Sequence, residues 1–183
     1  TYYEPSYYTV VYDHNGNVLL DKREKEGKRV LKETTSYLLT DMMEDVITSG
    51  TGTAAQISGM NVAGKTGTTS DNVDLTFYGY TPYYTAGIWM GYDTSKEMKN
   101  VSGSAHLKIW NHVMSQTHAE LPNKEFTRPD VIVTLSVCAA SGGQPSSLCS
   151  QDYYGYSARS DLAAADFQSD NSVCSLHKSY TVC

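Results

Sequence analysis

The sequence has neither an excess of basic residues nor a long apolar run. Its 14 lysines and arginines are outnumbered by 20 aspartates and glutamates, which gives a formal net charge of −6. Such a chain offers no positive field to a phosphate backbone, so we expect no nucleic-acid partner. No apolar stretch reaches the length needed to cross a bilayer, and the start shows no signal-peptide pattern. Because Thr1 lies inside a β-prone stretch, we interpret the chain as a fragment whose membrane anchor would lie upstream.

Cysteine is scarce and confined to the last quarter, at Cys138, Cys149, Cys174 and Cys183. Serine, glycine, tyrosine and aspartate surround these positions and offer little apolar core. We therefore expect disulfides, and hence an extracytoplasmic setting, in preference to free thiols. Four cysteines allow three pairings, and the sequence does not choose among them. No C-x-x-C pair is present and His177 alone is near, so we expect no metal site.

The remaining composition is that of a soluble globular domain, with 40% hydrophobic and 19% charged residues among 183. Apolar residues recur at helical spacing over 34–48 and over 104–117. Strand-like patterns occupy five stretches, the first two joined by an Asn-Gly turn: 7–12, 17–20, 60–69, 75–80 and 84–92. These patterns predict an α+β fold in which helices pack on an antiparallel sheet.

A domain boundary is predicted close to residue 130. After Pro129 one more strand is expected at 131–137, and beyond Cys138 the pattern becomes rich in serine, glycine and tyrosine. We therefore divide the chain into a domain at 1–130 and a C-terminal extension at 131–183.

One short motif allows a nucleotide-binding interpretation. The segment 59–66 (GMNVAGKT) fits the P-loop pattern G-x-x-x-x-G-K-[ST]. A P-loop also needs a buried strand before it and a helix after it, because the helix N-terminus binds the phosphates. The flanking segments 53–58 and 67–72 are poor candidates for either. A P-loop protein therefore stays an alternative, as does a non-enzymatic extracellular module stapled by disulfides.

Four motifs in a fixed order carry a more specific signal: GTGTAA at 50–55, GKTGTT at 64–69, FYGYTP at 77–82 and GIWMGYD at 87–93. This order strongly resembles the C-terminal part of the transpeptidase domain of class A (bifunctional) penicillin-binding proteins. The resemblance extends over about 125 residues and implies part of the penicillin-recognising serine transpeptidase fold. It also implies that the chain needs no cofactor.

The resemblance assigns roles to the Lys-Thr-Gly strand. Lys65 would place a positive charge beside the substrate carboxylate and the reacting hydroxyls, while the hydroxyls of Thr66 and Thr68 would bind that carboxylate. Gly67 would let a ligand approach the strand closely. The backbone N–H of Thr68 would supply half of the oxyanion hole, and Thr69 would complete the substrate-binding wall. The implied ligands are peptidoglycan stem peptides and the β-lactams that mimic them.

The family's nucleophilic serine is missing from this sequence. It lies in an S-x-x-K motif upstream of Lys-Thr-Gly, and an S-x-N loop also precedes the triplet; neither motif occurs before Lys65. Downstream matches exist at 70–72 and at 175–178, but we reject both as catalytic because Ser70 is on the same segment as the triplet and Ser175 lies in the cysteine-flanked tail. The chain alone should therefore be inactive. Its parent would cross-link peptidoglycan at the extracytoplasmic face of the bacterial membrane.

Overall fold

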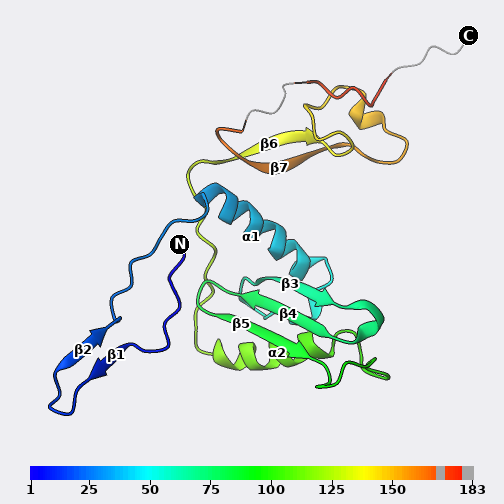
Figure 1. The fold of residues 1–183 in the computed structure, drawn as a ribbon. Coiled ribbons are helices and arrows are strands. Elements are labelled where there is room, and N and C mark those ends of the chain that lie inside the picture. The colour runs from blue at the N-terminus through cyan, green and yellow to red at the C-terminus, as the bar shows by residue number, and fades with distance from the viewer. Residues whose placement is uncertain (168–171, 179–183) are drawn as a thin grey trace, which may run out of the picture.

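The computed structural model describes residues 1–167 and 172–178. Figure 1 shows three parts: an N-terminal hairpin, a central unit (residues 33–121) of one sheet with two helices, and a C-terminal unit (residues 131–167 and 172–178) built on a separate strand pair. The predicted α+β architecture is confirmed. Neither helix combines the length and the apolarity that a membrane span requires, among the residues that the structure describes.

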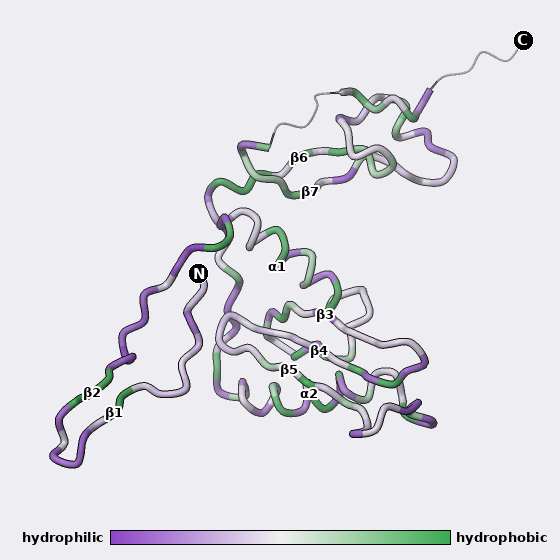
Figure 2. The backbone as a smooth tube through the Cα atoms, in the orientation of Figure 1, coloured by the Kyte–Doolittle hydropathy of each residue, from purple (hydrophilic) through white to green (hydrophobic). Residues whose placement is uncertain are grey.

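The predicted N-terminal hairpin is present, although its first strand is shorter than expected and its second begins one residue later. Strands β1 (Val10–Tyr12) and β2 (Val18–Asp21) pair antiparallel. In the turn, the Asp13 carboxylate accepts the backbone N–H of Asn17 at 2.9 Å, and Gly16 takes a left-handed φ of 84°. All of β2 is exposed, and Figure 2 shows that the connection from β2 towards α1 is largely hydrophilic. The hairpin therefore adds little to the hydrophobic core.

The central sheet has the order β3-β4-β5, with every neighbour antiparallel. Its strands are β3 (Ala63–Thr68), β4 (Leu75–Tyr80) and β5 (Thr85–Met90). In this register Lys65 lies opposite Tyr78, and Thr66 lies opposite Phe77. Directly opposed residues share a face of the sheet. Lys65 and Phe77 therefore point to opposite faces.

Two helices pack on this sheet as predicted. Helix α1 (Glu33–Thr48) lies along β3, and helix α2 (Ala105–Thr117) packs against β4 and β5. The rings of Phe77 and Trp110 meet edge to face, with centroids 5.0 Å apart. The buried core of this unit is drawn from both helices, the segment between them and β4: Ile47, Ala55, Ile57, Met60, Val62, Phe77, Leu107, Trp110 and Met114.

The C-terminal unit contains one strand that the sequence did not predict. Strand β6 (Ile132–Cys138), which was predicted, pairs antiparallel with β7 (Ala158–Ala164). The sequence of β7 is ARSDLAA, whose charges and alanines give no strand pattern, so its pairing with β6 decides its conformation. The segment beyond Cys138, in which no strand pattern was recognised, therefore does contain a strand. β6 begins just after the boundary predicted near residue 130.

Candidate active site

The Lys-Thr-Gly triplet lies on β3, which is an outer strand of the central sheet. β3 pairs with β4 on one side, and no strand from the described ranges 1–167 and 172–178 pairs with its other side. Gly64 is buried. It lies so close to β4 that an added Cβ would collide with the ring of Phe77 and the carbonyl of Tyr78. From Lys65 onward the strand becomes accessible. An outer strand of this kind can accept an extended peptide as an additional strand.

The exposed part of β3 is tied to the passage that follows α1. The hydroxyls of Thr51 and Thr66 are 2.8 Å apart and hydrogen-bonded. Lys65 is exposed and its Nζ donates to the carbonyl of Thr66 at 3.1 Å, so the ammonium lies along the strand. Two motifs separated in the sequence therefore meet at one place. Spacing alone did not predict the contact between Thr51 and Thr66.

Gly67 lies against Thr76, its neighbour on β4, which leaves no room for a side chain. A Cβ at this position would collide with the Thr76 hydroxyl, which donates to the Gly67 carbonyl at 3.3 Å. The resemblance assigns Gly67 to close approach by a ligand. The structure adds a second reason for glycine, which is that Thr76 occupies the space where the side chain would be.

Asp74 stabilises the turn after β3 through hydrogen bonds. The hydroxyl of Thr69 accepts the backbone N–H of Asp74 at 2.8 Å, and the Asp74 carboxylate accepts the indole N–H of Trp89 at 3.0 Å. Asp71 and Asn72 take left-handed φ values of 60° and 51°, which are uncommon for residues other than glycine. These contacts fix the turn at Thr69, which directly follows the end of β3 at Thr68.

The placement of the two downstream motifs agrees with their rejection as catalytic. Ser70–Asn72 forms a short 3₁₀ helix directly after β3, so it cannot face the same strand from across a cleft. Ser175 follows Cys174 in the C-terminal unit, where no helix occurs within residues 172–178.

The P-loop alternative does not fit this geometry. Lys65 and Thr66 lie inside β3, and the strand continues to Thr68. In a P-loop the same two residue types open a helix whose N-terminus binds phosphate. Here the strand leads into a three-residue 3₁₀ helix and then into β4.

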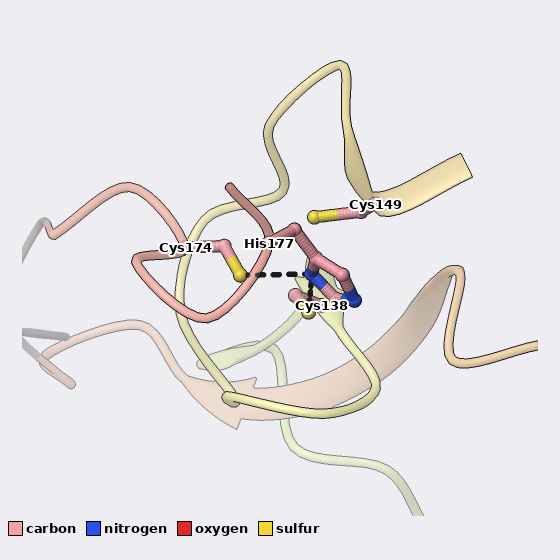
Figure 3. A group of neighbouring side chains, drawn as sticks. All are labelled: Cys138, Cys149, Cys174 and His177. Atoms are coloured by element: carbon pink, nitrogen blue, oxygen red, sulfur yellow. Dashed lines mark hydrogen bonds between the residues drawn. The ribbon is translucent and has the colours of Figure 1, made fainter. Parts of the chain in front are cut away.

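The expectation of disulfides is corrected for three of the four cysteines. Cys138, Cys149 and Cys174 are buried free thiols, and their sulfurs converge with an imidazole nitrogen of His177 (Figure 3). Cys183 lies outside the described residues. The three thiols meet at a single point and are not arranged as disulfide-bonded pairs. The alternative of an extracellular module stapled by disulfides therefore lacks support among these three cysteines.

The same cluster bears on the expectation of no metal site. That expectation rested on the lack of a C-x-x-C pair and on His177 as the one histidine near the cysteines. The sequence does contain a signal, the C-x-x-H spacing of Cys174 and His177. Hydrogen bonds lower the pKa of the Cys174 thiol to about 5, the Ser141 side chain contributing most.

The fold and the Lys-Thr-Gly strand together are those of a penicillin-recognising transpeptidase. A model of the family described as penicillin binding protein transpeptidase domain matches residues 1–115. This match covers more than half of the chain, and the chain belongs to that family.

Named relatives agree with this assignment. The chain is 42% identical over 145 residues to penicillin-binding protein 1A of Clostridium perfringens, covering 79% of this chain and 18% of that protein. It is 39% identical over 153 residues to penicillin-binding protein 1A of Clostridium botulinum, covering 83% of this chain and 18% of that protein. The chain thus spans less than a fifth of the length of these relatives.

A solved structure supports the fold independently. The crystal structure of penicillin-binding protein 1A from Haemophilus influenzae superimposes with a TM-score of 0.62 at 15% sequence identity, covering 90% of this chain and 29% of that one. At this identity the likeness concerns the fold alone.

Proposed function

We propose that the protein to which this chain belongs is a serine-type D,D-transpeptidase that cross-links peptidoglycan and is acylated by β-lactams. The chain supplies the Lys-Thr-Gly wall of the active site, and an upstream portion of the same protein supplies the nucleophilic serine. One observation carries the proposal: an accessible outer strand presents Lys65 and Thr66, and a hydrogen bond to Thr51 holds that strand against the passage after α1.

The reaction follows from these parts. The serine hydroxyl attacks the carbonyl of the terminal D-alanyl-D-alanine bond, D-alanine leaves, and an amine of a second stem peptide releases the acyl group from the serine. Lys65 and the hydroxyls of Thr66 and Thr68 bind the substrate carboxylate, and Thr69 completes the wall. The backbone N–H of Thr68 stabilises the developing oxyanion together with the N–H of the serine.

The proposed substrate determines where the site must lie. Because stem peptides belong to the cell wall, we place the site at the extracytoplasmic face of the membrane. The side of β4 that carries Tyr78 is open, since this tyrosine is 66% exposed and shares a face with Lys65. We propose that the upstream portion of the protein covers this face and completes the cleft.

A charge-removing substitution tests the role of Lys65. In the complete protein, Lys65→Ala should lower the rate of acylation by a fluorescent penicillin by about 10²-fold or more, because preorganised charge is lost at the reacting centre. Rates are measured from gel fluorescence against time. Lys108→Ala is the matched control, since Lys108 is an exposed lysine on α2. An unchanged rate in Lys65→Ala would remove Lys65 from the site.

A test on the isolated chain shows whether the Lys-Thr-Gly strand reacts without the proposed upstream serine. We expect intact-mass spectrometry to find no covalent adduct when this chain is incubated with a reactive penicillin. An adduct on Ser70 or Ser175 would show that a downstream serine is the nucleophile and that the division of the active site proposed above is wrong.

A further inference from the structure

Four side chains converge in the C-terminal unit, and neither the Lys-Thr-Gly strand nor the transpeptidase reaction uses them. They are Cys138 at the end of β6, Cys149 at the start of a 3₁₀ helix, and Cys174 and His177 after β7 (Figure 3). One ligand atom from each lies within 4.8 Å of all the others. The three cysteines are 0%, 1% and 7% exposed.

The spacing of these atoms suits a tetrahedral metal centre. Zinc–sulfur bonds of about 2.3 Å with tetrahedral angles place neighbouring thiolate sulfurs about 3.8 Å apart. Here Nδ1 of His177 lies 3.1 Å from the sulfur of Cys174 and 3.5 Å from that of Cys138. A small inward adjustment of the side chains would bring the four atoms to bonding distance of one central ion.

The imidazole is oriented as a metal ligand requires. Its Nδ1 faces the sulfurs, while Nε2 lies 2.8 Å from the carboxylate of Asp152. That carboxylate is fixed in turn, because its other oxygen accepts the backbone N–H groups of Tyr154 and Tyr156 at 2.8 and 2.9 Å. A carboxylate on the outer nitrogen is the usual way in which proteins fix the tautomer and ring orientation of a zinc-binding histidine.

The backbone also suits thiolates. The N–H of Ser146 donates to the sulfur of Cys149 at 3.2 Å. The turn after Cys138 is closed by two backbone hydrogen bonds, from Gly142 to the Cys138 carbonyl at 2.8 Å and from Cys138 to the Gly143 carbonyl at 2.9 Å. Cys174 is joined to the first turn through its N–H, which donates to Gln144 at 2.8 Å. Separate segments are therefore held around one point.

The cluster also occupies the place of a hydrophobic core. In the described part of this unit, the buried cluster consists of Cys138, Cys149 and Cys174 alone. Outside this cluster, Ile132 is the one buried apolar side chain in the described part of the unit, and it and three thiols bury too little apolar surface to order a segment of this length. In small zinc domains the binding of a structural zinc ion itself supplies the free energy of folding.

We propose that Cys138, Cys149, Cys174 and His177 bind one zinc ion, through three thiolates and Nδ1 of the imidazole, as a structural site that closes the C-terminal unit. Zinc binds the deprotonated form of each cysteine, so any thiol that still carries a proton releases it as the ion enters, and the occupied site keeps one net negative charge. All four coordination positions are filled by protein, which is typical of structural and not of catalytic zinc. Asp152 is a positioning residue.

Metal content tests the proposal on the whole chain. The chain is produced in zinc-supplemented medium, purified under reducing conditions, and dialysed against metal-free buffer. Native mass spectrometry should then find one zinc ion per chain. Replacement by cobalt should give the visible absorption of tetrahedral cobalt and a thiolate charge-transfer band of the intensity expected for three sulfurs. This spectrum decides the matter for the unaltered chain even where a variant fails to fold.

Variants identify the ligands. Cys149→Ser and His177→Asn should each lose the zinc, while the matched replacements Cys183→Ser and His14→Asn should keep it. Asp152→Asn should keep the zinc but weaken its affinity about 10- to 100-fold, measured by competition with a chromophoric chelator, because the imidazole is no longer held. An Asp152→Asn chain with unchanged affinity would contradict the positioning role.

Two results would overturn the zinc site. One is a reduced, zinc-supplied chain that carries no metal, and the other is full retention of zinc in both Cys149→Ser and His177→Asn. In the first case, a mass deficit of two hydrogens per cysteine pair after purification in air would identify disulfides as the true state of the cysteines.

Discussion

The central unit and the C-terminal unit are stabilised in opposite ways. The core cluster of the central unit contains nine buried apolar residues, drawn from both helices, β4 and the segment between α1 and β3, whereas the buried cluster of the C-terminal unit contains three cysteines. In the first case many contacts share the stabilisation, so one loss leaves the others in place. In the C-terminal unit several chain segments meet at the single cysteine cluster. The folding of the C-terminal unit therefore depends on the proposed zinc ion, whereas the central unit is stabilised by its own hydrophobic core.

This difference also separates the chemistry of the two units. The Lys-Thr-Gly strand lies in a sheet with a packed core, and Thr66 and Thr69 are hydrogen-bonded to neighbouring segments. The role proposed for this strand, to present backbone and hydroxyl groups to a substrate, needs such a supporting structure. The cluster of Cys138, Cys149, Cys174 and His177 is far from Lys65 in the sequence and contributes no residue to the Lys-Thr-Gly strand.

The largest effect on the central unit is expected from Phe77→Ala. Phe77 is fully buried against Trp110, so its removal should lower the free energy of unfolding by about 3–5 kcal/mol. Chemical denaturation followed by tryptophan fluorescence measures the change. The adjacent Tyr78→Ala is the control, because Tyr78 is an exposed aromatic on the same strand.

The same variant tests the independence of the two units. Phe77→Ala should leave the zinc content of the C-terminal unit unchanged, since the two buried clusters share no residue. A parallel loss of zinc would mean that the units fold as one, and the contrast between them would fail.

A smaller effect is expected from Gly67→Ala on β3. The added methyl group would meet the Thr76 hydroxyl, so the variant should lose about 1–3 kcal/mol of stability. In the Gly67→Ala/Thr76→Ala double variant most of this loss should be recovered, because the obstructing hydroxyl is gone. A double-mutant cycle from thermal unfolding gives the coupling. If the two losses simply add, Thr76 is not the reason for glycine at this position.

Much of the central unit could be predicted from the sequence because its signals are local. Helical spacing gave α1 and α2 within a residue or so of their observed starts, and the alternation in 75–80 gave β4 as observed. The order of the four motifs gave the family. These features depend on neighbours in the chain, which a single sequence displays directly.

The features that were missed depend on partners far away in the chain. Strand β7 forms because β6 pairs with it, and the contact of Thr66 with Thr51 depends on how the helix and sheet pack. The convergence of Cys138 and Cys149 on His177 depends on the turns between them. In the sequence itself, the C-x-x-H spacing of Cys174 and His177 is the one local sign of this cluster.

Half-buried His177 and buried His106 differ in their partners, and this difference predicts a pH effect. His177 is paired with Asp152, whereas both ring nitrogens of buried His106 lack a hydrogen-bond partner among the described residues. Burial lowers the pKa of His106 below its usual value, and the nearby Thr76 backbone offsets only part of that effect.

The sign of the pH effect follows from this lowered pKa. The unfolded chain takes up a proton on His106 near pH 6.5, and the folded chain does so only at lower pH. Stability is therefore unaffected well above about pH 6.5 and falls as the pH drops through that value, because the proton favours the unfolded state. Denaturant midpoints at about pH 7 and about pH 5 should differ less in His106→Leu than in the unaltered chain. His14→Gln, at an exposed histidine, should keep the original difference. An unchanged pH dependence in His106→Leu would mean that other groups cause the loss.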